Sequence, residues 1–171
     1  MLTLVILALV TAERLMELFL AKRNAERLLA QGAVESGAAH FPWITGVLTV
    51  WLLGIWILAW QTPPHLGWLT IFFVAMGLKL WTIATLGPRW TARIITLPGA
   101  PLVLRGPYRF IRHPNYVFLM AEIAALPLAF GLAWYALIFS LFVGLMLWIR
   151  IRAENAALAP HWQQVGTDAR A

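Results

Sequence analysis

Long apolar runs alternate with short polar connectors over most of this chain. Residues Met1–Leu20 are apolar except for three charged positions, Trp43–Trp60 is uncharged with a tryptophan at each end, and Leu66–Leu86 contains a single lysine. A helix needs about 20 apolar residues to cross the hydrocarbon core of a bilayer, and tryptophan is enriched at the two membrane interfaces. The pattern therefore predicts three transmembrane helices in the first half of the chain.

Two further apolar runs lie in the second half. Pro114–Leu126 is short, and Pro127 and Gly131 interrupt it, which predicts a kinked helix or one arm of a tight hairpin. Trp134–Glu154 is long enough to cross the membrane and to extend beyond it, because its last turns are charged. The predicted fold class is an all-α integral membrane protein with about five transmembrane helices.

Charged residues interrupt these predicted helices at a few positions. Glu13 and Glu17 share one helix face, and Arg14 is close enough to pair with Glu17. Charges inside a membrane helix are costly and usually face the bundle interior, although an ion cluster at headgroup level fits this helix end equally well. Lys79 could pair inside the bundle with a carboxylate such as Glu122, but the basic loop nearby favours a snorkelling amine.

Composition narrows the class of protein. Of the 171 residues, 61% are hydrophobic and 12% are charged, and the mean hydropathy of +0.77 is too high for an ordinary water-soluble domain. The absence of cysteine excludes structural disulfides and thiolate metal sites, and the four histidines are too scattered for a metal cluster. Basic residues flank apolar runs rather than a soluble module, which argues against nucleic acid as a partner.

The net charge of +6 is unevenly distributed. No acidic residue occurs between Glu35 and Glu122, whereas one connector in that interval is rich in arginine. Those arginines are Arg89, Arg93, Arg105, Arg109 and Arg112. Basic connectors stay on the cytoplasmic side, so we expect the amino terminus outside and this connector, with the carboxyl terminus, in the cytoplasm. Orientation and attraction to anionic lipid headgroups could by themselves account for the arginines.

A polar island at Arg105–Tyr116 stands between the apolar runs. Gly106-Pro107 predicts a stiff turn, and His113-Pro114 predicts a helix start, because proline suits the first helical position. The preceding segment, 93–104, has the pattern of a short extended hairpin around Pro98-Gly99. The polar island and a second polar patch, Arg150–Asn155, bracket a predicted helical hairpin, so the two should meet in one site.

The chemistry of that site is open from the residues alone. Arg150 and Glu154 are four positions apart and share a helix face, as a solvent-exposed ion pair would. His113 at a helix start is either a hydrogen-bonded boundary residue or a contact for an anionic ligand. No dinucleotide-binding fingerprint, P-loop, zinc-protease motif or serine-hydrolase motif is present, and no βαβ pattern supports a Rossmann-type enzyme.

A motif common to the two patches resembles a known family. Gly106-Pro-Tyr-x-x-x-Arg-His-Pro-x-Tyr116, followed after two apolar segments by Arg150-Ile-x-x-Glu154-x-x-x-Leu158, is similar to the isoprenylcysteine carboxyl methyltransferase family. The resemblance implies a membrane methyltransferase that uses S-adenosyl-L-methionine, with Arg150 orienting the methyl acceptor and the acceptor's lipid tail between helices. The implied cofactor-binding residues are Leu104, Gly106, Tyr108, Arg112, His113, Pro114, Tyr116 and Glu154.

A looser resemblance extends over most of the chain. Glu13-Arg14-x-x-Glu17 and Leu86-Gly87-x-Arg89-Trp90-Thr91 look like the small bacterial branch of that family, which includes members similar to O-methyltransferases of alkylpyrone or alkylresorcinol lipids. The eukaryotic pattern has two adjacent acids where this chain has Glu154-Asn155. Both points favour a small hydroxylated lipid as acceptor over a prenylated protein carboxylate.

A hydroxylated acceptor must lose a proton, so a base is expected near the reacting oxygen. Glu122 is the candidate, because burial inside a membrane helix makes a carboxylate a stronger base. The whole chain would form one domain: three helices in 1–86, the cofactor-binding and catalytic part in 87–158, and a polar tail in 159–171. The partners expected are a lipophilic acceptor entering from the bilayer, membrane lipids, and neither metal nor nucleic acid.

Two other function classes fit the composition. A membrane reductase of the sterol-reductase type shares the plan of a carboxy-terminal cofactor pocket between helices, but it would bind NADPH. A small non-enzymatic membrane protein or transporter would use the intramembrane residues Lys79 and Glu122. Binding of labelled S-adenosyl-L-methionine or of NADPH separates these alternatives.

Overall fold

The computed structural model describes residues 1–38 and 40–168. It is mostly helical, with one pair of short strands. The elements in chain order are α1 (Leu2–Ala30), β1 (Val34–Ser36), α2 (His40–Ala59), α3 (Leu66–Leu86), the 3₁₀ turn η1 (Gly87–Arg89), β2 (Ile94–Thr96), the 3₁₀ turn η2 (Gly106–Arg109), α4 (Pro114–Ala129) and α5 (Ala133–Asp168). The predicted predominance of helix is confirmed.

Three helices among the described residues are long and apolar enough to cross a membrane. They cover Phe41–Ala59 in α2, Leu66–Arg89 at α3, and Ala133–Ala159 in α5. The second and third apolar runs of the sequence thus form helices close to the predicted bounds, because a helix satisfies all of its own backbone hydrogen bonds in lipid. α4 is apolar but shorter, and α1 carries the charged residues near its middle.

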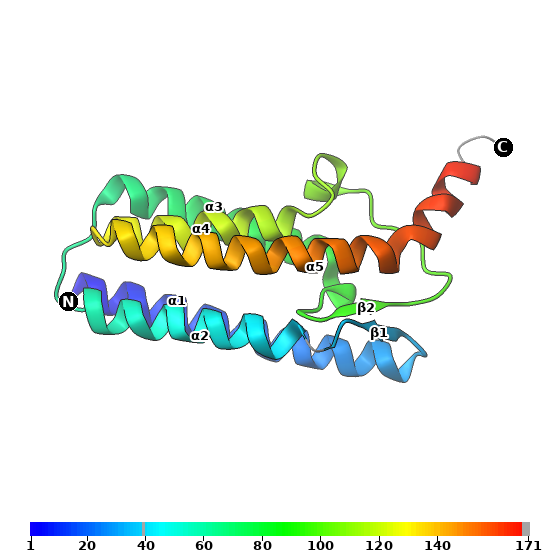
Figure 1. Cartoon of the computed structure of the whole chain (residues 1–171), viewed down its shortest axis with the longest axis horizontal. Helices are drawn as coiled ribbons and strands as arrows, with labels where there is room; N and C mark the ends of the chain where they lie inside the picture. The colour runs from blue at the N-terminus through cyan, green and yellow to red at the C-terminus, as the bar shows by residue number, and fades with distance from the viewer. Residues whose placement is uncertain (39, 169–171) are drawn as a thin grey trace.

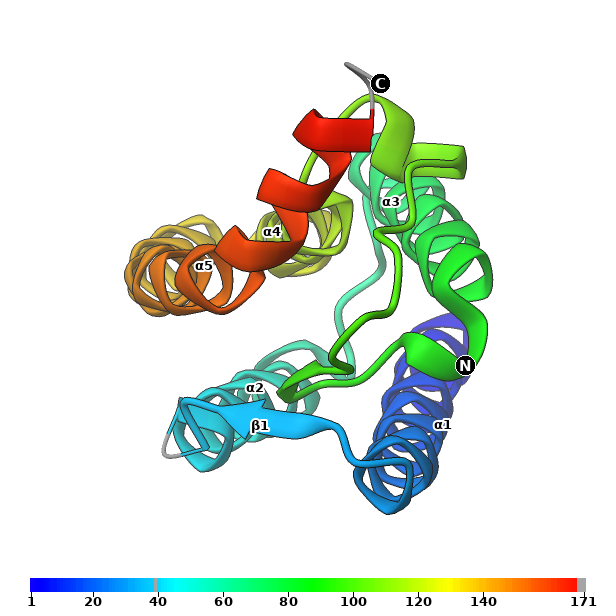
Figure 2. The same ribbon diagram turned by 90° about the vertical axis from the view of Figure 1, so that its right-hand side faces the viewer.

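The five helices run roughly parallel to the long axis in two layers (Figure 1). α1 and α2 form one layer, and α3, α4 and α5 form the other, as the end view shows (Figure 2). The amino terminus and the α2–α3 and α4–α5 connections lie at one end. The polar island, both strands and the carboxy-terminal part of α5 lie at the other end, so segments far apart in sequence meet there.

An apolar core joins the two layers. Leu7, Ile55, Phe72, Ile123 and Val143, one from each helix, are fully buried in it. Large apolar side chains also cover the outside of the bundle, most of them on the helices predicted to span a membrane. Such an exposed apolar surface is unfavourable in water and is typical of helices surrounded by lipid.

The predicted hairpin within 93–104 is wrong. Ile94–Thr96 instead pairs antiparallel with Val34–Ser36 of the α1–α2 connection, with Val34 opposite Thr96. The three-residue strand in the α1–α2 connection is a partner of matching length. Arg93 also forms an ion pair with Glu35 at 3.3 Å. This pairing ties the loop that precedes the polar island to the first helical layer.

Two helix ends also differ from the prediction. α1 continues as helix to Ala30, beyond the apolar run that ends at Leu20, and α5 continues to Asp168, so the predicted tail is helical over its described part. Residues 169–171 lie outside the described residues. α4 passes Pro127 and ends at Ala129, and Gly131 at φ +73° turns the chain into α5, which is the tight hairpin of the two alternatives.

Candidate functional site

A cavity of about 340 Å³ lies between the two layers. Apolar residues of α2 and α5, such as Leu48, Leu52 and Leu147, form much of its wall. The charged residues in the wall form two groups: Arg14 and Glu17 on α1 lie with Lys79 on α3, whereas those of the loop before α4 lie with those of the polar part of α5. The cavity therefore combines an apolar wall with two separate polar groups.

Tyr116 is the centre of the polar group at the start of α4. Its hydroxyl donates a hydrogen bond of 2.6 Å to Glu154 Oε2 and accepts one of 2.8 Å from Arg150 Nε. His113 stacks on the Tyr116 ring, with ring centroids 5.6 Å apart. The imidazole lies between two α5 side chains, with Nδ1 3.5 Å from Glu154 Oε2 and Nε2 2.9 Å from Asn155 Oδ1.

Arg150 is buried, with 6% of its surface exposed. Besides its bond to Tyr116, it donates from Nη2 to the carbonyl oxygen of Ala92 at 2.5 Å. Arg150 and Glu154, which the sequence places on one helix face, are linked through the Tyr116 hydroxyl rather than by a direct ion pair. These two bonds use two of the five N–H groups of the guanidinium, which leaves others that could bind a ligand in the cavity.

The electrostatics of this group depend on Glu154. Its hydrogen bond to His113, aided by its negative charge, raises the pKa of the imidazole above the ordinary value, although burial opposes this. Burial raises the pKa of the Tyr108 phenol well above its usual range, and Glu154 adds to the shift. The site thus keeps tyrosine neutral and favours a protonated histidine beside a carboxylate.

Local sequence explains how these side chains are positioned. Pro114 takes the first turn of α4, which places His113 at the helix start, on the wall of the cavity. On the other side, the buried amide of Asn24 donates to the carbonyl oxygens of Gly87 and Trp90 at 3.3 and 2.9 Å. This fixes the η1 turn and, two residues later, the carbonyl of Ala92.

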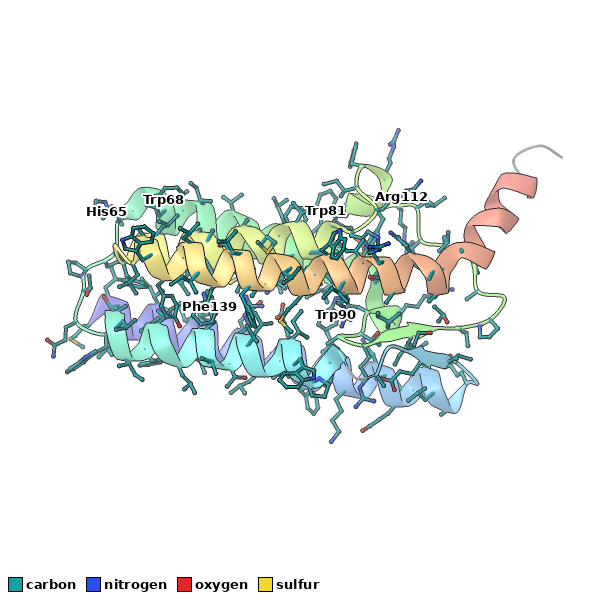
Figure 3. All side chains as sticks on the ribbon, in the orientation of Figure 1. His65, Trp68, Trp81, Trp90, Arg112 and Phe139 are labelled. Carbon is teal, nitrogen blue, oxygen red and sulfur yellow. The ribbon has the colours of Figure 1, made fainter. Side chains whose placement is uncertain are left out.

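The structure brings together many of the predicted site residues. Tyr108, Arg112, His113, Tyr116, Arg150 and Glu154 all border the cavity. Figure 3 marks Arg112 beside the start of α4 and Trp90 between the layers, whereas His65 lies at the opposite end of the bundle. The convergence of the polar island with the second polar patch is therefore present in the structure.

Leu104, Gly106 and Pro114 do not border this cavity. Leu104 is 48% exposed and lines a second, more open cavity of about 820 Å³. Gly106 packs so closely on Thr85 that an added Cβ would lie 2.6 Å from its hydroxyl oxygen, at a φ of +58°. Pro114 is buried. These three residues shape the loop and its entry into α4.

The prediction for Lys79 was wrong. Its amine does not snorkel: only 2% of the residue is exposed, and Nζ lies 3.0 Å from Glu122 Oε2, 2.8 Å from Glu13 and 2.6 Å from Glu17. The reason is that α3 turns this face toward α1 and α4, where three carboxylates compensate the ammonium charge. Arg14 pairs with Glu17, as predicted, and also with Glu122.

Glu122 itself is fully buried and does not border the cavity. Arg14 and Lys79, which do border it, each hold the Glu122 carboxylate. A ligand in the cavity would therefore meet Arg14, Glu17 or Lys79 before Glu122. The placement does not favour Glu122 as a base in direct contact with an acceptor.

Several contributors were missed by reading the sequence. Asn24 and the carbonyl of Ala92 carry no local signal, and Asn155 was noticed only as a departure from a motif. Asn115 was also missed: it borders the cavity, and its side-chain oxygen is buried without a hydrogen-bond partner. Only its place next to His113-Pro114 could have suggested it.

Comparison with known proteins gives a family and two relatives. The model of the family described as the isoprenylcysteine carboxyl methyltransferase (ICMT) family matches residues 68–160. The uncharacterized protein YpbQ of Bacillus subtilis (strain 168) is 32% identical over 158 residues, covering 90% of this chain and 94% of the relative. An uncharacterized protein of Haemophilus influenzae is 24% identical over 159 residues, 89% of this chain and 92% of the relative. No solved structure matches the chain.

Proposed function

Since the chain belongs to the isoprenylcysteine carboxyl methyltransferase family, we propose that it is a membrane methyltransferase that moves a methyl group from S-adenosyl-L-methionine to an oxygen of a lipophilic acceptor. The observation that carries this proposal is the hydrogen-bonded group of His113, Tyr116, Arg150 and Glu154 on the wall of a cavity with apolar sides. All four residues fall within the matched part of the chain.

The donor and acceptor set fits S-adenosyl-L-methionine. Glu154 would accept hydrogen bonds from the cofactor's ammonium group or ribose hydroxyls, and a protonated His113 would hold its carboxylate. The unpartnered oxygen of Asn115 offers one more acceptor beside them. Tyr108 and Arg112 would close the same site. The bound cofactor supplies an activated methyl group on its sulfonium.

Leu104, Gly106 and Pro114 have an indirect part in the proposed site. Gly106 keeps the loop close to α3, and Pro114 sets the start of α4, so both would position Tyr108 and His113. Leu104 would hold the outer side of the same loop. We expect substitutions there to weaken cofactor binding through the shape of the loop.

The acceptor is proposed to be a small hydroxylated lipid. Its alkyl chain would lie against Leu48, Leu52 and Leu147, and would enter laterally from the bilayer, past the apolar faces of α2 and α5. A remaining N–H group of the Arg150 guanidinium would face the reacting oxygen and stabilise its developing negative charge. Acceptor affinity should rise by about 0.8 kcal/mol for each added methylene until the apolar wall is covered.

The proposal includes five membrane-spanning helices. α1 would cross with its charges turned inward, and α4, although short, would cross beside α3. The amino terminus would lie outside, and the polar island and the end of α5 would lie in the cytoplasm, where the cofactor is made. Single-cysteine labelling tests this arrangement directly.

The decisive experiment is cofactor binding and turnover by the purified protein. Labelled S-adenosyl-L-methionine and NADPH are each offered to the wild type and to His113→Ala, Glu154→Ala and His65→Ala. Leaving a buried partner without its hydrogen bond costs about 1–3 kcal/mol, so the first two variants should bind S-adenosyl-L-methionine about 5- to 150-fold more weakly. His65→Ala, at the opposite end of the bundle, should bind like the wild type.

Turnover is then measured with alkylresorcinols and alkylpyrones of increasing chain length and with a farnesyl-cysteine analogue. Methylation of the hydroxylated lipids supports the proposed acceptor class, and methylation of farnesyl-cysteine alone refutes it. Retention of NADPH instead of S-adenosyl-L-methionine would identify a reductase. Binding of neither cofactor would refute an enzyme of either kind and would leave a transporter or other membrane protein.

A further inference from the structure

An ion cluster, defined as Glu13, Arg14, Glu17, Lys79 and Glu122, joins three helices inside the bundle. Lys79 Nζ from α3 lies within 3.0 Å of a carboxylate oxygen of each of the three glutamates. Arg14 on α1 is 2.9 Å from Glu17 and 3.6 Å from Glu13, and it also pairs with Glu122 on α4. All five side chains are therefore held by one another.

The ion cluster contains one more acid than base. Three carboxylates face one guanidinium and one ammonium, so the formal charge of the fully ionised cluster is −1. Buried ion pairs contribute little to stability compared with well-packed apolar side chains, and an uncompensated buried charge is costly. An excess carboxylate in this position therefore favours the uptake of one proton.

The ion cluster is in contact with the cavity. Arg14, Glu17 and Lys79 form part of the cavity wall, which they share with Tyr116 and Arg150, whereas Glu13 and Glu122 lie behind them. The α2 wall brings no charged residue, because Phe41–Ala59 contains none. The other titratable or charged groups on the wall are Tyr108, Arg112, His113, Tyr116, Arg150 and Glu154.

Along the bundle axis the ion cluster lies deeper than the proposed cofactor site. Glu122 follows Tyr116 by six positions on α4, which corresponds to about 9 Å of helix. Glu154, which bonds to Tyr116 and His113, belongs to the proposed cofactor site itself, and Arg150 has no basic lone pair. Of the carboxylates in the ion cluster, only Glu17 is on the cavity wall.

We propose that the ion cluster, entered through Glu17, takes up the proton that a hydroxylated acceptor loses when it is methylated. This inference rests on the proposed function. As the acceptor oxygen forms its bond to the methyl carbon, the bond from sulfur to that carbon breaks and its electron pair stays on sulfur. The O–H bond breaks in the same step, its electron pair stays on oxygen, and the proton passes to the Glu17 carboxylate.

The charges balance within the cavity. Before transfer, the net charge of +1 on S-adenosyl-L-methionine faces the charge of −1 on the ion cluster. After transfer, the demethylated cofactor has lost its sulfonium charge, the methylated lipid is neutral, and the ion cluster has gained one proton and is neutral. No net charge is created in a region of low dielectric constant, where an isolated charge would be most unfavourable.

The first test needs neither cofactor nor acceptor. The infrared band of protonated carboxyl groups is followed in the purified protein as the pH is lowered. We expect a band that develops well above pH 5, where exposed carboxylates with an ordinary pKa of about 4 are still ionised. The band should be absent in that range from Glu17→Gln and from Glu13→Gln, which both remove the excess acid. A wild type without such a band overturns the proposal.

The second test separates proton uptake from support of the fold. Glu17→Gln, Glu13→Gln and the control Glu26→Gln, at an exposed α1 position, are assayed with an alkylresorcinol and with an alkylated cysteine carboxylate of equal chain length. A phenol has a pKa of about 10 and needs a base, whereas the carboxylate is already ionised. Loss of a general base should slow methylation of the phenol about 10²-fold or more, and should slow the carboxylate reaction far less.

The pH profile adds an internal control. In Glu17→Gln the rate on the alkylresorcinol should rise about tenfold per pH unit below the pKa of the phenol, as hydroxide replaces the missing base, and should approach the wild-type rate at high pH. Equal slowing of both acceptors, or no slowing of either, overturns the inference while leaving the methyltransferase proposal intact. If the wild type methylates neither acceptor, the proposed function itself fails. If Glu17→Gln does not fold, the Glu13→Gln variant and the infrared titration of the wild type test whether the ion cluster takes up a proton.

Discussion

Replacing Tyr116 with phenylalanine removes one oxygen atom from the centre of the proposed cofactor site. That oxygen donates to Glu154 at 2.6 Å and accepts from Arg150 at 2.8 Å, so the change breaks two hydrogen bonds to charged groups. The phenylalanine ring still fills the space and can still stack beside His113. The perturbation is therefore electrostatic rather than steric.

The magnitude follows from burial. Arg150 is almost fully buried, so its Nε would be left without a partner, at a cost of about 1–3 kcal/mol. Part of this cost appears as a loss of folding stability. The rest should appear as weaker binding of S-adenosyl-L-methionine and slower turnover, because Glu154 and Arg150 would no longer be held at a fixed separation. A tenfold loss in affinity corresponds to about 1.4 kcal/mol.

The assay compares Tyr116→Phe with Tyr135→Phe. Tyr135 also uses its hydroxyl to join two helices, donating to the carbonyl of Trp51 at 2.8 Å, but it does not border the cavity. Thermal unfolding and cofactor affinity are measured for both variants. We expect both to lose some stability and only Tyr116→Phe to lose cofactor affinity. Unchanged affinity in Tyr116→Phe, or an equal loss in both variants, would refute the reasoning.

Three further predictions test other parts of the molecule. The pKa of His113 is raised in the folded state, so the stability that its protonated form contributes is fully present below about pH 6.5 and is lost as the pH rises through the raised pKa. Glu154→Gln should flatten this pH dependence of the free energy of unfolding, measured with denaturant. An unchanged dependence would contradict the role given to Glu154. Cysteines introduced at Thr62 and Thr96 should differ in intact cells, with an impermeant reagent labelling the first and not the second; the opposite pattern would reverse the topology. Lys79→Met should lower the free energy of unfolding by about 3–5 kcal/mol, because it leaves three carboxylates with only one cation; a loss below about 1 kcal/mol would show that the ion cluster is not tightly coupled.

The sequence by itself determined the helices and the place of the site. Apolar runs such as Leu66–Leu86 predict helix bounds closely, because a segment in lipid must satisfy its own backbone hydrogen bonds and local composition decides whether it can. The convergence of His113 with Glu154 also followed from the sequence, since two polar patches that bracket a helical hairpin must return to the same end. Both inferences use only neighbouring residues or the length of a helix.

Tertiary structure decided which residues face one another. Lys79 could extend to the membrane surface or pair with three buried carboxylates, depending on how α3 is rotated about its axis against α1 and α4. A helix that is apolar on every side does not specify that rotation. The same holds for the strand pairing of Ile94–Thr96 with Val34–Ser36, and for the bond from Arg150 to the carbonyl of Ala92. These contacts join segments about 60 residues apart, and their geometry depends on how whole helices pack rather than on any local signal in the chain.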